Sequence, residues 1–346
     1  MQTVASPGIK WNLAGIWNNV AMKENRPLVK RDYTYASEIG MPMYDRFLKM
    51  KAVPFTNPPN QRSLRKFLAG NIWENTVKQI LIACGVYRHE EVKIDAAPYN
   101  DCLWVHGRCD FIAGGYVDGE AATRTLVLLA LPDYLQKIGE KIIEQLEGKT
   151  LEEKILELKA VSTFAMDKVE RMNAAIPNHT MQAYHYQKNG RIPADVAYIC
   201  KDDCRMQQFR IDATATEPLY RKDLEQITYF FSKNKKPPLE PLAYFDNTIG
   251  KFSKHLGVEY SPYLSHYGFK EPDDYRQAIG YVEKWNRTLA RYVLAETGQT
   301  TPTGKPIVIT AKNKEIRAEI EKAKYKFSDL LAVKIELGNI SNEDED

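Results

Sequence analysis

The stretch Lys154-Ile-Leu-Glu-Leu-Lys-Ala-Val161 is an apolar run that carries two opposite charges two residues apart. Its composition predicts a β-strand, in which alternate side chains point to the same face. Glu157 and Lys159 then share one face, while the leucines between and before them point to the other. Two charges on an otherwise buried strand are costly unless they are used. A carboxylate that can hold a divalent cation, next to a lysine that can meet a water or a phosphate, suits metal-assisted phosphodiester chemistry, although Glu-x-Lys also occurs on exposed strands.

The composition sets broad bounds on the class of protein. The 346 residues, 44% of them hydrophobic, are enough for one large domain or two ordinary ones. The formal net charge of +3 decides nothing about nucleic-acid binding, because the acidic end at 342–346 offsets basic residues elsewhere. The absence of an apolar run of about 18 residues predicts no membrane span. Five cysteines without framework spacing predict a reducing compartment, so we expect a cytoplasmic protein.

The periodicity of apolar residues predicts an order of helices and strands. Helical spacing is found at 63–84, 132–154, 163–172 and 179–188. Strand-like patterns are found at 92–94, 102–113, 154–161, 194–200 and 207–212. Gly114 and Gly115 predict a turn, and periodicity does not decide between helix and strand for 125–131. This order predicts an α/β fold with a mixed central sheet flanked by helices.

The same reading divides the chain into three regions. We expect a helical N-terminal extension at 1–62 and a core at 63–215 that contains the helical insert at about 132–154. A mostly helical C-terminal region at 216–346 is expected to pack on the core, with an acidic tail at 342–346.

Further polar residues stand in an ordered series around the charged strand. Asp110 lies three residues after a glycine in an otherwise apolar strand, and Glu74 lies four residues after Gly70 on the long helix. Gln182 and Tyr186 are four residues apart and therefore share one face of a later helix. Together with the Glu-x-Lys strand, these elements form a series of four motifs.

This series resembles the PD-(D/E)XK nuclease superfamily, and within it the RecB-like and phage-exonuclease branch, over about residues 35–212. The resemblance implies a restriction-endonuclease-like core in which Asp110 and Glu157 are metal ligands and Lys159 is the catalytic lysine. The main-chain carbonyl of Leu158 would be a further metal ligand.

The resemblance also implies roles for the two flanking helices. Glu74 would complete a second metal position. Many RecB-like members have histidine at that position, and the glutamate of this chain is more similar to the phage exonucleases. Gln182 and Tyr186 would position the DNA strand. The oxygen-rich ligand set suits Mg²⁺ or Mn²⁺. No iron–sulfur cluster is expected, because the regions at 37–46 and 260–267 contain no cysteine.

The leading hypothesis is a metal-dependent deoxyribonuclease, most simply an exonuclease in recombination, repair or phage DNA metabolism. A single-strand annealing or other recombination protein is the implied partner, in a bacterial host cytoplasm if the protein is phage-encoded. Two alternatives remain open: a structure- or sequence-specific endonuclease, and a nuclease-fold module that binds DNA or protein without cleavage. The sequence does not fix the oligomeric state.

Each candidate residue also has an ordinary structural interpretation. Asp110 could cap the turn that the two glycines predict. Glu74 could form an ion pair with Lys78 on the same helix. Gln182 and Tyr186 could belong to a plain amphipathic face.

Overall fold

The computed structural model describes residues 28–129, 133–246, 250–300 and 303–327. The chain divides into two compact units, Met1–Pro54 with Pro59–Lys236, and Phe55–Pro58 with Pro237–Asp346. The first unit ends at Lys236, and the described residues up to Pro54 belong to it. The acidic tail at 342–346 lies outside the described residues.

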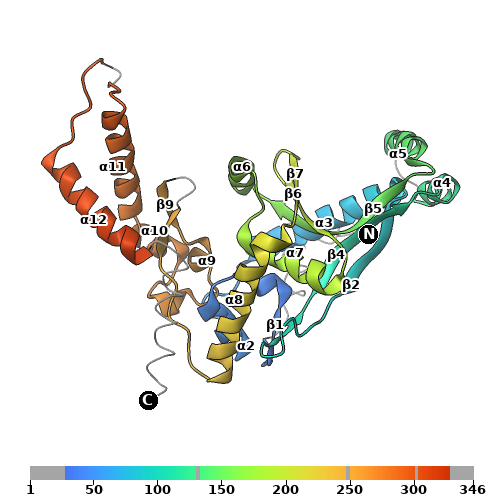
Figure 1. The fold of residues 1–346 in the computed structure, drawn as a ribbon, viewed down its shortest axis with the longest axis horizontal. Coiled ribbons are helices and arrows are strands. Elements are labelled where there is room, and N and C mark those ends of the chain that lie inside the picture. Colours follow the sequence, from blue (N-terminus) through green and yellow to red (C-terminus); the bar gives the residue numbers. More distant parts are fainter. Residues whose placement is uncertain (1–27, 130–132, 247–249, 301–302, 328–346) are drawn as a thin grey trace, which may run out of the picture. The chain divides into compact units, whose positions relative to one another are not determined.

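The first unit contains a five-stranded sheet with the order β2-β4-β5-β6-β7 (Figure 1). Its strands are β2 (Tyr87–Lys93), β4 (Arg108–Tyr116), β5 (Thr150–Val161), β6 (Ala194–Cys200) and β7 (Met206–Arg210). β5 and β6 are parallel, and the other neighbours are antiparallel. Every residue of β6 is buried, as expected for a strand covered on both faces. This mixed sheet with flanking helices confirms the predicted α/β class.

The helices of this unit follow the predicted periodicity closely. They are α2 (Met43–Met50), α3 (Gln61–Ala83), α4 (Gly119–Leu128), α5 (Asp133–Leu146), α6 (Thr163–Met172), α7 (Pro177–Gly190) and α8 (Ala213–Ser232). The described part of the ambiguous segment 125–131 is therefore helical up to Leu128. The insert is helical as predicted, but β5 already begins at Thr150, so the last residues of the insert belong to the charged strand.

The predicted turn at Gly114 and Gly115 is wrong. β4 continues through both glycines to Tyr116, and its register against β5 shifts between Ala113 and Gly115. Both glycines have positive φ, 117° and 80°, and a Cβ at Gly114 would meet the main chain of Glu152. The two glycines therefore form a β-bulge within the strand, which sequence alone does not distinguish from a turn.

The N-terminal part of the first unit is fixed to the rest by a buried ion pair. β1 (Tyr33–Tyr35) pairs in parallel with β3 (Trp104–His106), and the short 3-10 helix η1 (Ala36–Glu38) follows. Arg46 on α2 donates to Asp223 on α8 over 2.6 Å, and both side chains are buried. The main-chain N–H of Gly40 donates to the same carboxylate.

The second unit has its own core and is mostly helical. A small hairpin of β8 (Ala243–Asp246) and β9 (Lys251–Lys254) precedes its helices. These are α9 (Leu256–Glu259), the 3-10 helix η2 (Leu264–Tyr267), α10 (Pro272–Ala278), α11 (Tyr281–Glu296) and α12 (Ala311–Phe327), of which the last two form the long pair in Figure 1. Its buried residues include Val258, Leu264, Tyr275, Ile316 and Ile320. Among the helices that the structure describes in the whole chain, none has the length and apolar character needed to span a membrane.

Candidate active site

The two predicted metal-binding carboxylates lie on neighbouring strands. Phe111 of β4 pairs with Leu156 of β5, so one step along this antiparallel register brings Asp110 beside Glu157. Oδ2 of Asp110 accepts a hydrogen bond of 2.7 Å from the main-chain N–H of Leu158. The alternative of Asp110 as a turn cap is therefore set aside, because its partner lies on β5 and β4 has no turn after it.

Lys159, Glu157 and Gln182 form one connected network. The Lys159 ammonium donates to Oε1 of Glu157 over 2.6 Å and to Oε1 of Gln182 over 3.0 Å. Nε2 of Gln182 donates to the same Oε1 of Glu157 over 2.7 Å. Because an ammonium only donates and a carboxylate only accepts, these partners fix the orientation of the Gln182 amide.

Helix α7 carries Gln182 into this network, and the four-residue spacing places Tyr186 beside it. Both side chains are buried, and Nε2 of Gln182 donates to the Tyr186 hydroxyl over 3.1 Å. The hydroxyl in turn donates to the carbonyl of Arg108 over 3.2 Å. Gly107 permits this approach, since a Cβ there would lie 2.6 Å from Cε1 of Tyr186. The two residues therefore lie on the inner face of α7 and are joined to each other by a hydrogen bond.

Glu157 has an unusual environment for a carboxylate. Its residue is 2% exposed, and its second oxygen, Oε2, is buried without a hydrogen-bond partner among the described residues. Burial raises the pKa of Glu157, and the neighbouring Lys159 offsets part of that rise. Burial and the charge of Glu157 together raise the pKa of Asp110 well above its usual range. A pair of acids in this state favours a bound cation.

Lys159 remains a cation in this site. Its burial alone would lower the pKa of the amine, but the carboxylates of Glu157 and Asp110 outweigh that effect and raise it. A lysine with a raised pKa is a hydrogen-bond donor and a positive charge, and it does not serve as a proton acceptor near neutral pH.

Glu74 faces a polar cavity of about 430 Å³ between α3 and the strands β2 and β4, which Asp110 also lines. Burial, Glu91 and Glu157 raise the pKa of Glu74, in that order of size. Lys78, the suggested partner of Glu74, instead forms an ion pair of 2.5 Å with Glu90. Glu74 therefore belongs to the neighbourhood of the two strand carboxylates.

An ion pair that lines this cavity was not predicted from the sequence. Glu91 on β2 and Arg108 on β4 line the cavity and form an ion pair of 3.0 Å with each other. Glu91 has a φ of 51°, which is uncommon for a residue with a side chain inside a strand. Arg108 directly follows the glycine of the Gly-x-x-Asp motif, which was the one available signal.

The side-chain carboxylates of this site are too few to hold a hard divalent cation alone, so main-chain or water oxygens would also have to bind it. Among the described residues, no group of three or more histidine, cysteine, aspartate or glutamate side chains is arranged to hold a metal ion. Asp110 and Glu157 offer two carboxylates with one orphaned buried oxygen, so main-chain carbonyls and waters would have to complete a six-coordinate shell. This matches the preference of Mg²⁺ for few carboxylates and several waters.

The two histidines of α7 have structural partners. Nδ1 of His185 lies 2.7 Å from the Tyr220 hydroxyl, and Nε2 lies 2.9 Å from the carbonyl of Ile94. Nδ1 of His179 lies 2.9 Å from the Tyr198 hydroxyl, and burial and the nearby Lys159 lower its pKa to about 3. Both rings are therefore neutral near pH 7.

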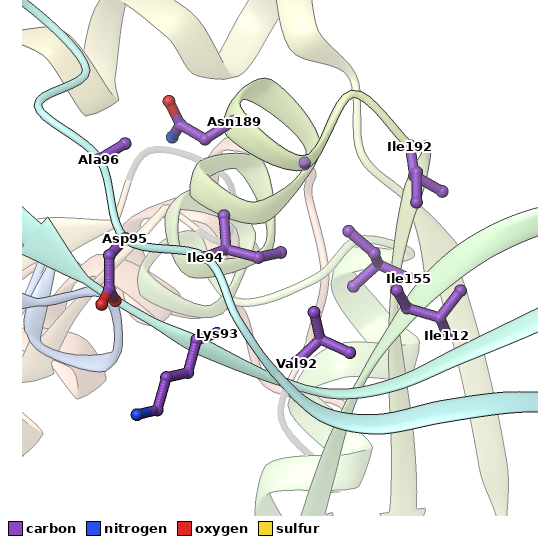
Figure 2. Close-up of a pocket in the computed structure, with 10 residues that line it drawn as sticks. Val92, Lys93, Ile94, Asp95, Ala96, Ile112, Ile155, Asn189 and Ile192 are labelled. Atoms are coloured by element: carbon purple, nitrogen blue, oxygen red, sulfur yellow. The ribbon is translucent and has the colours of Figure 1, made fainter.

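A second pocket, of about 360 Å³, lies between the segment after β2 and the C-terminal end of α7 (Figure 2). Its walls include the apolar side chains of Ile94, Ile112, Ile155 and Ile192, and Asp95 is the one carboxylate among its lining residues. This lining does not resemble a cation or phosphate site.

Comparison with known proteins yields distant structural likenesses only. No family model matches the chain, and no curated protein matches it. The crystal structure of a protein named SSO0001 shares 13% identity at a TM-score of 0.38, covering 63% of this chain and 87% of that one. An alkaline exonuclease from Laribacter hongkongensis shares 10% identity at a TM-score of 0.33, covering 64% and 93% respectively. Both likenesses concern the fold alone, and neither distinguishes the RecB-like branch.

Proposed function

We propose that this protein is a divalent-metal-dependent deoxyribonuclease in which Asp110, Glu157 and Lys159 form the active centre. The observation that carries the proposal is the buried Glu157, whose Oε2 has no partner among the described residues, beside the carboxylate of Asp110 and the ammonium of Lys159. Keeping two acids and a lysine buried together costs stability, and such costs are typical of sites that act on charged substrates. DNA as the substrate rests on the resemblance of the four motifs.

The two carboxylates would bind Mg²⁺ or Mn²⁺, with the carbonyl of Leu158 and waters as further ligands and Glu74 near a second position. When bound, the cation would polarise the scissile phosphate and lower the pKa of the attacking water. Asp110 would be one of the residues that hold it, and the N–H of Leu158 orients the Asp110 carboxylate through Oδ2.

Lys159 would orient the attacking water or stabilise the charge that develops on the phosphate. Its protonated state suits both tasks, since each requires a donor. In the present arrangement its ammonium neutralises Oε1 of Glu157, the oxygen that also accepts from Gln182.

Gln182 and Tyr186 would act chiefly by holding the network in place. Gln182 contacts both members of the Lys159–Glu157 pair, and Tyr186 links Gln182 to the main chain of β4. Residues buried in this way fix the geometry of their neighbours. Positioning of the DNA strand, as the resemblance implies, would be a second role.

An exonuclease is the preferred form of the activity, because the Gln-x-x-x-Tyr helix resembles the end-processing branch. The test is digestion of end-labelled linear duplex, linear single-stranded and closed circular DNA with Mg²⁺, Mn²⁺ or EDTA. The wild-type protein and Glu157→Ala are compared under the same conditions.

Metal-dependent loss of linear DNA alone, absent in Glu157→Ala, is the expected result. Cutting of circles would identify an endonuclease at the same site. Undiminished activity of Glu157→Ala would refute the site. DNA binding without cleavage by wild type would instead indicate a non-cleaving module.

A further inference from the structure

The backbone of β2 is distorted beside the candidate metal ligands. In a regular strand, Glu90 and Glu91 would point to opposite faces of the sheet. Glu91 has a left-handed φ of 51°, and Glu90 and Glu91 both line the cavity that Asp110 also lines. Such a conformation is strained, and residues that keep it cluster at functional sites.

The partner of Glu91 is the guanidinium of Arg108, at 3.0 Å. The main chain of Arg108 is held in place, because Arg108 on β4 pairs with Lys93 on β2 and the Arg108 carbonyl accepts a hydrogen bond from the Tyr186 hydroxyl. The side chain itself is 54% exposed, and that of Glu91 is 51% exposed. Arg108 therefore combines a rigid attachment with a guanidinium that is open to solvent.

Arg108 and Asp110 are two residues apart on one strand, so their side chains leave the same face about 7 Å apart. This separation is comparable to that of successive phosphates along a nucleic-acid strand. A phosphodiester held at Asp110 and Glu157 would thus place a neighbouring phosphate near Arg108. The planar guanidinium suits bidentate contact with a phosphate.

We propose that Arg108 binds the DNA phosphate next to the one that is hydrolysed, and that Glu91 holds the guanidinium in place until the strand enters. This proposal rests on the proposed nuclease function and adds a residue that sets the register of the strand. It also explains how a cavity lined by Glu74, Glu91 and Asp110 accepts a polyanion, since Arg108 supplies a positive charge at its rim.

Exchange of Glu91 for a phosphate costs little. An exposed ion pair contributes little to stability, whereas a charge-assisted bond from a guanidinium to phosphate is stronger and bidentate. The Glu91–Arg108 pair is therefore a restraint that a DNA strand can displace.

The test measures cleavage of a linear oligonucleotide duplex by wild type, Arg108→Gln, Arg108→Lys and Glu91→Gln. The control is Arg124→Gln, because Arg124 is an exposed arginine, 68% accessible, that pairs with Glu120 on α4 away from the cavity. Each enzyme is also given duplexes in which a neutral methylphosphonate replaces the phosphate immediately before or immediately after the first bond cut.

We expect Arg108→Gln to raise KM about tenfold or more while kcat changes little, since a charge-assisted contact is lost in the bound state. The slope of log KM against log salt concentration should fall by about one, the change expected when one phosphate contact is lost. Arg108→Lys should restore part of the affinity. Glu91→Gln should lower KM. One of the two methylphosphonates should impair wild type and have no further effect in Arg108→Gln.

Two results would overturn the proposal while the nuclease function stands. In the first, Arg108→Gln has the same KM and the same salt dependence of KM as Arg124→Gln. In the second, both methylphosphonates impair Arg108→Gln as much as wild type. Failure of the wild-type protein to cleave any DNA with any metal would instead remove the nuclease function, and this inference with it.

Discussion

The main-chain N–H of Leu158 donates to Oδ2 of Asp110 over 2.7 Å, so the strand that carries Glu157 also holds the neighbouring carboxylate. The two acids are brought together by the sheet itself, and no flexible loop is involved. The sheet thereby maintains an arrangement of like charges that the side chains alone would avoid.

Asp110→Asn should stabilise the metal-free protein while removing activity. Asparagine can still accept the hydrogen bond from Leu158, but it no longer repels Glu157. We expect a gain of about 1 kcal/mol, or roughly 2–4 °C in Tm, measured by thermal unfolding in EDTA. A lower Tm than wild type would contradict the account of Asp110 as a destabilised acid.

The same pair predicts a pH dependence. The pKa of Asp110 is higher in the folded protein than in the unfolded chain, so the folded state binds the proton more tightly. The stability from this group is therefore present at low pH and is lost as pH rises through the raised pKa. The gain in the free energy of unfolding from Asp110→Asn should be greatest near neutral pH and should vanish in acid. Denaturant unfolding of both proteins at several pH values measures this difference. A constant difference would refute it.

Gln182→Leu should separate a holding role from a DNA-contacting role. Leucine nearly preserves the volume but removes the bonds to Lys159, Glu157 and Tyr186. We expect kcat to fall about 10- to 100-fold with little change in DNA affinity, since residues that orient ligands have effects of this size. Steady-state kinetics and gel retardation provide the two readouts. Weakened DNA binding with kcat preserved would support the strand contact instead.

Gly107→Ala should damage the site through packing. The added Cβ would lie 2.6 Å from Cε1 of Tyr186, which would have to move together with its bonds to Gln182 and Arg108. We expect a loss of about 1–3 kcal/mol by denaturant unfolding, together with reduced kcat. Gly70→Ala is the matched control, because nothing lies within 4 Å of a Cβ there and alanine favours the helix. Equal effects of the two substitutions would contradict this view.

Much of the first unit could be predicted from the sequence because its elements are strongly periodic. The charged strand and the helices α3, α6 and α7 follow from apolar spacing. Sequence spacing also predicted that Gln182 and Tyr186 share a face, and they do. The register that joins Asp110 to Leu158 could not be read from spacing, since it depends on pairing across the insert.

The errors arose where the backbone departs from regular geometry. A glycine pair with positive φ occurs in turns and in bulges alike, and in this chain it forms a bulge in β4. Glu91 was overlooked because no residue pattern marks a left-handed glutamate inside a strand. The buried pair Arg46–Asp223, which ties α8 to α2, joins residues far apart in sequence, so local spacing does not reveal it.

The measurement that tests the central claim most directly is Mn²⁺ binding followed by electron paramagnetic resonance, with Mg²⁺ as competitor. Wild type is compared with Asp110→Asn, Glu157→Gln and Asp195→Asn. Asp195 is the matched control because it is also buried with one unpartnered oxygen among the described residues, but Lys154 neutralises it at 2.8 Å. We predict that wild type and Asp195→Asn bind Mn²⁺, and that the other two variants lose at least about tenfold in affinity. Equal binding by all four proteins, or none by wild type, would contradict the account.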